Sequence, residues 1–207
     1  MMSAAGYLHK RLNPKDRPSP VLTHRFKRGG LARTLNALGL RKGAEIGVAD
    51  GRYSHYLCTN IDDIELLCVD PWEKYHGNPR GGPQTQHDGN YEKAQERLAP
   101  YNATLVKAFS MDAVRDVPLE SLDWIYVDAN HSFDWVMQDI IEWAKRVKRG
   151  GIVAGHDYYS FRWAGVCEAV NAYTRAHNVK EWFVTDEREP SFFWAKRTRK
   201  DVAEGMR

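Results

Sequence analysis

Short apolar strands alternate with helical segments along most of this 207-residue chain, and that alternation limits the possible folds more than any other feature. Strands that alternate with helices form parallel βαβ units, and two strands joined by a short polar turn form an antiparallel hairpin. We therefore expect an α/β fold with a doubly wound, mostly parallel seven-stranded sheet that ends in an antiparallel C-terminal hairpin. The expected strands are 44–48, 64–70, 103–108, 122–128, 151–155, 181–186 and 191–197.

One domain is expected, because a chain of this length is too short for two domains of ordinary size. Residues 1–22 contain three prolines and predict an irregular N-terminal arm, residues 23–197 form the single domain, and residues 198–207 form a basic C-terminal tail. The polar segment 73–91 predicts a long loop that could act as a lid or recognise an acceptor, with a helix at 91–99 after it.

The clearest helix is an apolar stripe that begins at Phe133 and continues to Val147 at helical spacing. Basic residues follow at its C-terminal end, where they suit the negative end of the helix dipole. Gly150 and Gly151 then predict where the helix stops.

Basic residues are concentrated at the two ends of the chain. Residues 1–30 carry a charge of +6 and residues 196–207 carry +3, so the middle carries −6 within the total of +3. Basic ends around an acidic body could attract a polyanion such as nucleic acid. Solvated tails that aid solubility are the favoured alternative.

The three cysteines, Cys58, Cys68 and Cys167, are scattered and form no C-x-x-C pair. This pattern argues against a zinc site or a disulfide framework and fits a reducing compartment. No apolar run approaches the roughly 20 residues of a membrane span, and no signal-peptide core precedes the first expected strand. We expect a cytoplasmic protein that does not contact a membrane.

The first buried strand ends in the pattern Glu45-x-Gly47-x-x-x-Gly51. Glycines at this point let the backbone turn tightly and approach a ligand. The pattern differs from the G-x-G-x-x-G that holds a pyrophosphate, and the carboxylates of Glu45 and Asp50 would favour a cationic ligand instead. Asp70 ends the second strand about 20 residues further on, where a carboxylate can accept hydrogen bonds from both hydroxyls of a ribose.

Acids and histidines follow the fourth and fifth strands. The stretch "VDANHS" carries Asp128 and His131, and "GHDYY" carries His156 and Asp157. Because parallel strands end at the same edge of a sheet, these four side chains should lie on neighbouring loops. Two carboxylates with a nearby imidazole suit a hard divalent cation such as Mg²⁺.

Together these motifs resemble the class I S-adenosylmethionine (SAM)-dependent methyltransferases over about residues 30–197. The resemblance implies a Rossmann-like sheet in which the glycine loop holds the methionine part of SAM and Asp70 holds the ribose. The loop after the third strand would receive the adenine, and Trp72 could flank the base. The implied cofactor-binding residues are Glu45, Gly47, Gly51, Ser54, Asp70, Trp72, Ser110 and Asp112. For Asp112 the alternative is a helix N-cap.

The arrangement D-x-x-H followed by GG-x-x-x-x-H-D-Y is similar to the metal-dependent O-methyltransferases that act on macrolide sugars and catechols. That resemblance implies Asp128, His156 and Asp157 as metal ligands, with His131 as the general base and Asp128 as a second candidate base. Relatives commonly carry an acid or amide in place of His156, so Mn²⁺ would suit this site as well as Mg²⁺ or better. The alternative for His131 is a cap or first-turn residue of the helix that follows.

The expected function is SAM-dependent, metal-assisted O-methylation of a hydroxyl on a small molecule or sugar. A metal lowers the pKa of that hydroxyl, and a histidine can take the proton at neutral pH. Two alternatives remain: a methyltransferase that binds nucleic acid through its basic termini, and a SAM-binding protein without catalysis. The N/D-P-P-[YFW] signature of amino-methylating nucleic-acid enzymes is absent from the sequence. A distant branch of the same fold resembles the cephalosporin hydroxylases. A homodimer is compatible with these features.

Overall fold

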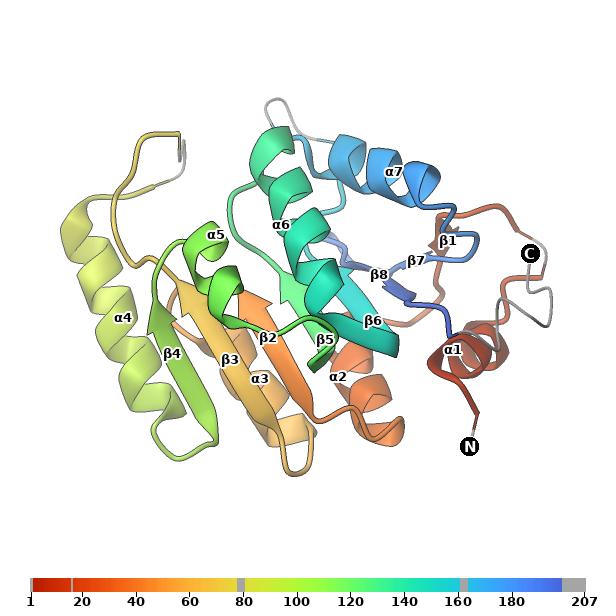
Figure 1. Ribbon diagram of the computed structural model, residues 1–207, viewed down its shortest axis with the longest axis horizontal. Coiled ribbons are helices and arrows are strands. Elements are labelled where there is room, and N and C mark those ends of the chain that lie inside the picture. The colour runs from red at the N-terminus through yellow and green to blue at the C-terminus, as the bar shows by residue number, and fades with distance from the viewer. Residues whose placement is uncertain (1, 16, 78–80, 161–163, 199–207) are drawn as a thin grey trace.

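An eight-stranded sheet forms the centre of the protein, as a computed structural model shows for residues 2–15, 17–77, 81–160 and 164–198 (Figure 1). The elements are α1 (Ala4–Leu12), β1 (Val21–Leu22), α2 (Arg28–Ala37), β2 (Lys42–Ile46), α3 (Arg52–Asn60), β3 (Glu65–Asp70), α4 (Gln84–Leu98), β4 (Ala103–Lys107), α5 (Ser110–Ala113), the 3-10 helix η1 (Val114–Asp116), β5 (Leu122–Val127), α6 (Phe133–Arg146), β6 (Val147–Gly155), α7 (Val166–Ala176), β7 (Phe183–Val184) and β8 (Phe192–Ala195). In this described part of the chain, none of the helices is long and apolar enough to cross a membrane.

The strands lie in the order β1-β7-β8-β6-β5-β2-β3-β4. Strands β2 to β6 run parallel, whereas β8 pairs antiparallel with both β6 and β7. The α/β prediction is therefore confirmed, with its mostly parallel sheet and its antiparallel hairpin. An eighth strand was not predicted, because the two residues of β1 are too few to show a periodic pattern.

The sheet is covered on both faces, as Figure 1 shows, with α6 and α7 in front and α2 and α3 behind. Successive β5 residues alternate between the two cores: Trp124 and Tyr126 pack with α1 to α4, and Ile125 and Val127 pack with α5 to α7. Parallel sheets need such double cover because both of their faces are apolar. Because helices cover both faces, a ligand can reach the sheet only at its edges, and the strand ends that carry the polar motifs lie at one of them.

The prediction of an irregular N-terminal arm over residues 1–22 is wrong for its first part, which is helical. Residues 4–12 form α1, in which the Ser3 hydroxyl accepts a hydrogen bond from the Gly6 amide at 3.2 Å. Leu8 is buried, and α1 packs against β6 and β8. The prediction gave weight to the three prolines, but all of them lie between α1 and β1, where they do not interrupt a helix. Of the predicted basic tail, residues 199–207 lie outside the described residues.

Two helix boundaries also differ from the prediction. Helix α4 begins at Gln84 rather than at residue 91, so much of the predicted 73–91 loop is helical. Its first two turns are polar and carry no apolar stripe for a periodicity argument to detect. Helix α6 ends at Arg146, and β6 begins at the next residue instead of at Gly151 as predicted. Val147 fits the helical stripe by spacing, but its β-branched side chain is equally suited to a strand.

The packing of α1 predicts the effect of truncating Leu8. Leu8→Ala should lower the free energy of unfolding by about 2–4 kcal/mol, because it leaves a cavity under α1. Lys10→Ala, on the exposed side of the same helix, is the matched control and should cost less than about 0.5 kcal/mol. Urea denaturation measures both. Equal, small losses would show that α1 does not pack as described.

Candidate functional site

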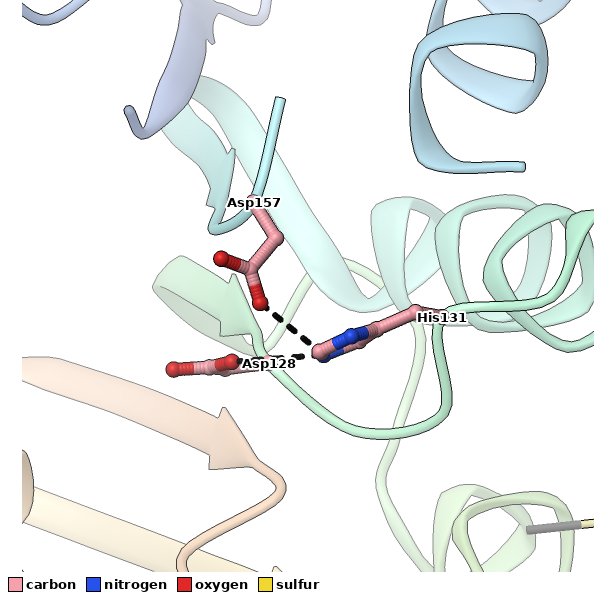
Figure 2. Close-up of side chains that lie close together, drawn as sticks. All are labelled: Asp128, His131 and Asp157. Atoms are coloured by element: carbon pink, nitrogen blue, oxygen red, sulfur yellow. Dashed lines mark ion pairs between the residues drawn. The ribbon is translucent and has the colours of Figure 1, made fainter. Parts of the chain in front are cut away.

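Three of the predicted site residues converge at the carboxyl ends of two adjacent strands (Figure 2). Asp128 follows β5, Asp157 follows β6, and His131 lies on the loop between β5 and α6. The Nε2 atom of His131 is 3.0 Å from Asp157 Oδ2 and 3.9 Å from Asp128 Oδ1. One potential ligand atom from each residue lies within 4.8 Å of the others. The three side chains thus face a common point.

His156 lines the same cluster from the end of β6. Its Nδ1 atom is 3.2 Å from Asp157 Oδ1 and 3.7 Å from Asp128 Oδ1. Burial lowers the pKa of His156, but its hydrogen bond with Asp157 and the charge of Asp128 outweigh burial and raise the pKa above its ordinary value. The structure therefore brings together all four residues that were predicted to act on metal or acceptor.

The donor set fits a divalent cation. Two carboxylates and an imidazole supply oxygen and nitrogen ligands, a combination suited to Mn²⁺ and other first-row ions as well as to Mg²⁺. The close set of three contains His131, whereas the predicted set contained His156. Asp157 is buried and the other two are only partly exposed, so a bound ion would be partly shielded from water.

Arg28, which sequence reasoning missed, reaches this cluster from the first turn of α2. Its Nη2 atom is 2.8 Å from Asp128 Oδ2, and its guanidinium carbon lies 3.6 Å from the ring centroid of Tyr53 and 4.8 Å from that of Tyr126. Asp128 thus gives one oxygen to Arg28 and turns the other toward the two histidines. In the sequence, Arg28 is one of seven basic residues near the N-terminus and nothing separates it from a surface charge.

Glu45 and Ser54 form a buried pair rather than an exposed anionic lining. Glu45 is 1% exposed, and the Ser54 hydroxyl donates a hydrogen bond to its carboxylate. Burial raises the pKa of Glu45 to about 8, which the Ser54 hydrogen bond and the Arg28 charge offset only in part. Glu45 is therefore mostly protonated at neutral pH, so the attraction for a cation expected from the sequence is weaker than a carboxylate would give.

The glycine loop is shaped by the neighbouring strand. Gly47 has a φ of +90°, and a Cβ at this position would collide with the carbonyl of Asp128. Gly51 has a φ of +76° and is the N-cap of α3. Both positions favour glycine on backbone grounds alone. The close approach at Gly47 also fixes the distance between the predicted cofactor loop and the acidic cluster.

Asp70 and Trp72 support the same loop from the end of β3. Asp70 Oδ2 accepts hydrogen bonds from the amides of Val48 and Ala49 at 2.9 and 3.0 Å, and its Oδ1 accepts one from the Trp72 amide at 2.8 Å. The Trp72 indole is fully buried and donates to the Ala49 carbonyl at 2.7 Å. Both residues hold the loop conformation in addition to any contact with a ligand, which stays a prediction.

Ser110 and Asp112 point in different directions. The buried Ser110 hydroxyl donates to Asp139 and accepts from the Trp143 indole at 2.8 Å. The Asp112 side chain is 62% exposed and lies 3.4 Å from Arg115. The N-cap of α5 is Phe109 and that of α6 is Ser132, so the capping alternatives for Asp112 and His131 are wrong.

Comparison with protein families identifies the class of protein. The model of the methyltransferase domain family matches residues 44–158, more than half of the chain, and this range includes every predicted site residue from Glu45 to Asp157. The chain belongs to this family and is a SAM-dependent methyltransferase. No curated protein matches the chain closely enough to count as a relative.

Solved structures share the fold at low sequence identity. An O-methyltransferase from Bacillus cereus in complex with SAH is 10% identical, with a TM-score of 0.61 over 93% of this chain and 90% of its own. The O-methyltransferase TomG from Streptomyces achromogenes, in complex with SAM, is 15% identical, with a TM-score of 0.60 over 94% and 88%. A precorrin-6y C5,15-methyltransferase from Geobacter metallireducens is 12% identical, with a TM-score of 0.60 over 89% and 96%.

The buried carboxyl of Asp139, beside the predicted adenine loop, makes stability depend on pH. Burial raises its pKa to about 7, and the hydrogen bond from Ser110 offsets only part of this shift. The folded state keeps a proton that the unfolded state loses above its pKa of 3.8. The free energy of unfolding should therefore fall as pH rises from about 4 to about 7.

Asp139→Asn should remove that part of the pH dependence and be more stable than wild type at pH 8 by about 2 kcal/mol. Urea unfolding at several pH values measures the difference between the two proteins. Asp112→Asn, which changes an exposed carboxylate, is the control and should leave the wild-type curve unchanged. Parallel curves for wild type and Asp139→Asn would contradict the assignment.

Proposed function

We propose that this methyltransferase transfers the methyl group of SAM to a hydroxyl of a small molecule or sugar, with the help of a divalent metal. The observation that carries the proposal is the convergence of Asp128, His131 and Asp157 at the carboxyl ends of β5 and β6. Ligands of parallel α/β sheets bind at this edge. The lack of C-x-x-C pairs and of any apolar membrane-spanning run in the sequence fits a cytoplasmic setting.

Asp128, Asp157 and His156 would hold the metal, and His131 would face the acceptor oxygen. A divalent cation such as Mn²⁺ or Mg²⁺, when bound there, lowers the pKa of a coordinated hydroxyl. His131 is the proposed general base, and its Nε2 atom receives the proton of the acceptor hydroxyl. The carboxylates of Asp157 and Asp128, 3.0 and 3.9 Å from this atom, stabilise the imidazolium that results.

Arg28 holds the Asp128 carboxylate in one orientation during this proton transfer. The ion pair at 2.8 Å engages Oδ2 and leaves Oδ1 facing His131 and His156. The Tyr53 and Tyr126 rings hold the guanidinium in place through cation–π contact. Removing Arg28 would free Asp128 to rotate, so we regard Arg28 as a positioning residue.

The O-methyltransferases among the structural neighbours support oxygen as the acceptor atom. The precorrin methyltransferase among them shows that this fold is also used for other acceptors. The choice of oxygen as acceptor atom therefore rests on the cluster of Asp128, His131, His156 and Asp157. Metal-assisted deprotonation, which such a cluster could support, is the chemistry that a hydroxyl acceptor needs.

Metal dependence is the first test of the proposal. EDTA should suppress transfer of labelled methyl from SAM to a panel of catechols and hydroxylated sugars, and Mn²⁺ or Mg²⁺ should restore it. Asp157→Asn should raise the metal concentration needed for half-maximal rate about tenfold or more while the Arg28 pair is retained. Calorimetry with Mn²⁺ alone gives the same comparison without turnover. Full activity in metal-stripped protein would rule out the metal role.

The role of His131 is tested separately. His131→Ala should lower kcat by about 10²–10⁴ with little change in SAM affinity. His55→Ala is the control, because this imidazole is paired with the Tyr101 hydroxyl at 3.1 Å, outside the cluster. A loss of less than tenfold in His131→Ala, with the large loss in Asp128→Asn, would make Asp128 the base instead.

A further inference from the structure

A second hollow lies away from the reaction cluster. It is a groove of about 770 Å³, bordered by α1, by the C-terminal end of α7 and by the residues after β8. In Figure 1, α1 lies beside the segment that leaves β8, although the two are far apart in the sequence. Arg149, in this groove, comes near the start of β6, whereas Asp157 of the cluster follows the other end of that strand. The groove and the cluster are thus at opposite ends of the sheet.

The groove carries a strong positive charge. Among the described residues that line it, the Lys and Arg residues are Arg17, Arg149, Lys180, Lys196 and Arg197, and Glu181 is the single acid. Glu120, outside the lining, lies 3.8 Å from Arg149 and 3.9 Å from Lys196 and offsets part of their charge. The Glu181 carboxylate lies 2.7 Å from His9 Nδ1, so its charge is directed at a neighbouring side chain. Arg17, Arg149 and Lys180 are exposed. Cations on three sides of one hollow favour an extended anion over a single carboxylate.

Aromatic rings stack along one wall of the same groove. Tyr173 and His177 stack with centroids 4.1 Å apart at 26°, and Tyr173 stacks on Trp194 at 5.7 Å and 29°. His177 ends this series and is exposed at the C-cap of α7. Stacked rings beside cations are the two features by which proteins hold unpaired bases and their phosphates. An acidic peptide would use the cations but not the rings.

We propose that this groove is a docking site for single-stranded nucleic acid, in which phosphates contact Arg17, Lys180 and Arg197 and a base stacks on His177. The site lies apart from the reaction cluster, so it binds a strand without acting on it chemically. The inference does not depend on which acceptor the methyltransferase modifies. The arrangement of charge and rings, rather than the net charge of +3, carries it.

Fluorescence anisotropy tests the proposal on the full chain, with labelled 12-nucleotide strands of oligo-uridylate RNA and oligo-thymidylate DNA as probes. Both should bind at low salt. If three or four phosphates are neutralised, a plot of log association constant against log salt should have a slope of about −2 to −3. Absence of binding at about 50 mM salt would overturn the proposal.

Variants then locate the site. Lys180→Glu with Arg197→Glu should weaken binding about tenfold or more, and His177→Ala should weaken it about fivefold. The matched control is Lys93→Glu with Arg115→Glu, which changes net charge equally at α4 and η1 and should have little effect. Thermal melting confirms that each variant folds.

Competition separates nucleic acid from other anions. Unlabelled oligo-uridylate should displace the probe, whereas poly-glutamate at the same charge concentration should displace it at least about tenfold less well, because it lacks bases to stack. Equal competition by poly-glutamate would overturn the assignment to nucleic acid, and equal weakening by the control pair would show that net charge alone binds the probe. Crosslinking of a 4-thiouridine strand to peptides that line the groove would support the site independently of any substitution.

Discussion

The pairing of β2 with β5 is the contact on which the site depends. The two strands are not consecutive in the chain, and their ladder runs from Gly43 opposite Trp124 to Ile46 opposite Val127. The Asp128 amide then donates to the Ile46 carbonyl at 2.7 Å, and the Asp128 carbonyl fills the space beside Gly47. One backbone contact therefore joins the glycine loop to the acidic cluster, at the point where the strand order reverses and α/β sheets bind their ligands.

Sequence alone predicted strands β2 to β8, the hairpin and the meeting of Asp128, His131, His156 and Asp157. This was possible because strand patterning fixes where each strand ends, and the parallel topology places those ends at one edge. Local pattern could not predict α1, whose two buried residues contribute only when β6 and β8 are present. Nor could it predict that Glu45 is buried beside Ser54, since depth in the fold depends on the helices packed above the strand.

Arg28 shows why a polar cluster cannot be derived from its motifs alone. It contacts Asp128, which lies 100 residues away in the sequence, and its position depends on the two tyrosine rings that enclose it. An unpaired carboxylate at this depth would incur a desolvation cost that the guanidinium offsets. Ser110 and Asp112 show the opposite case. One motif groups these two residues of a short helix together, but the Ser110 side chain is buried in the core and the Asp112 side chain is exposed to water.

The position of β8 has a consequence for how the chain folds during synthesis. Strand β8 follows β1 to β7 in the chain and leaves the ribosome after them, yet it lies between β6 and β7, and α1 packs against it. Strands β2 to β6 form a continuous parallel sheet that can assemble as soon as they emerge. Helix α1 precedes both of its packing partners in the chain and gains them fully only after β6 and β8 have emerged, so an early segment completes its packing late.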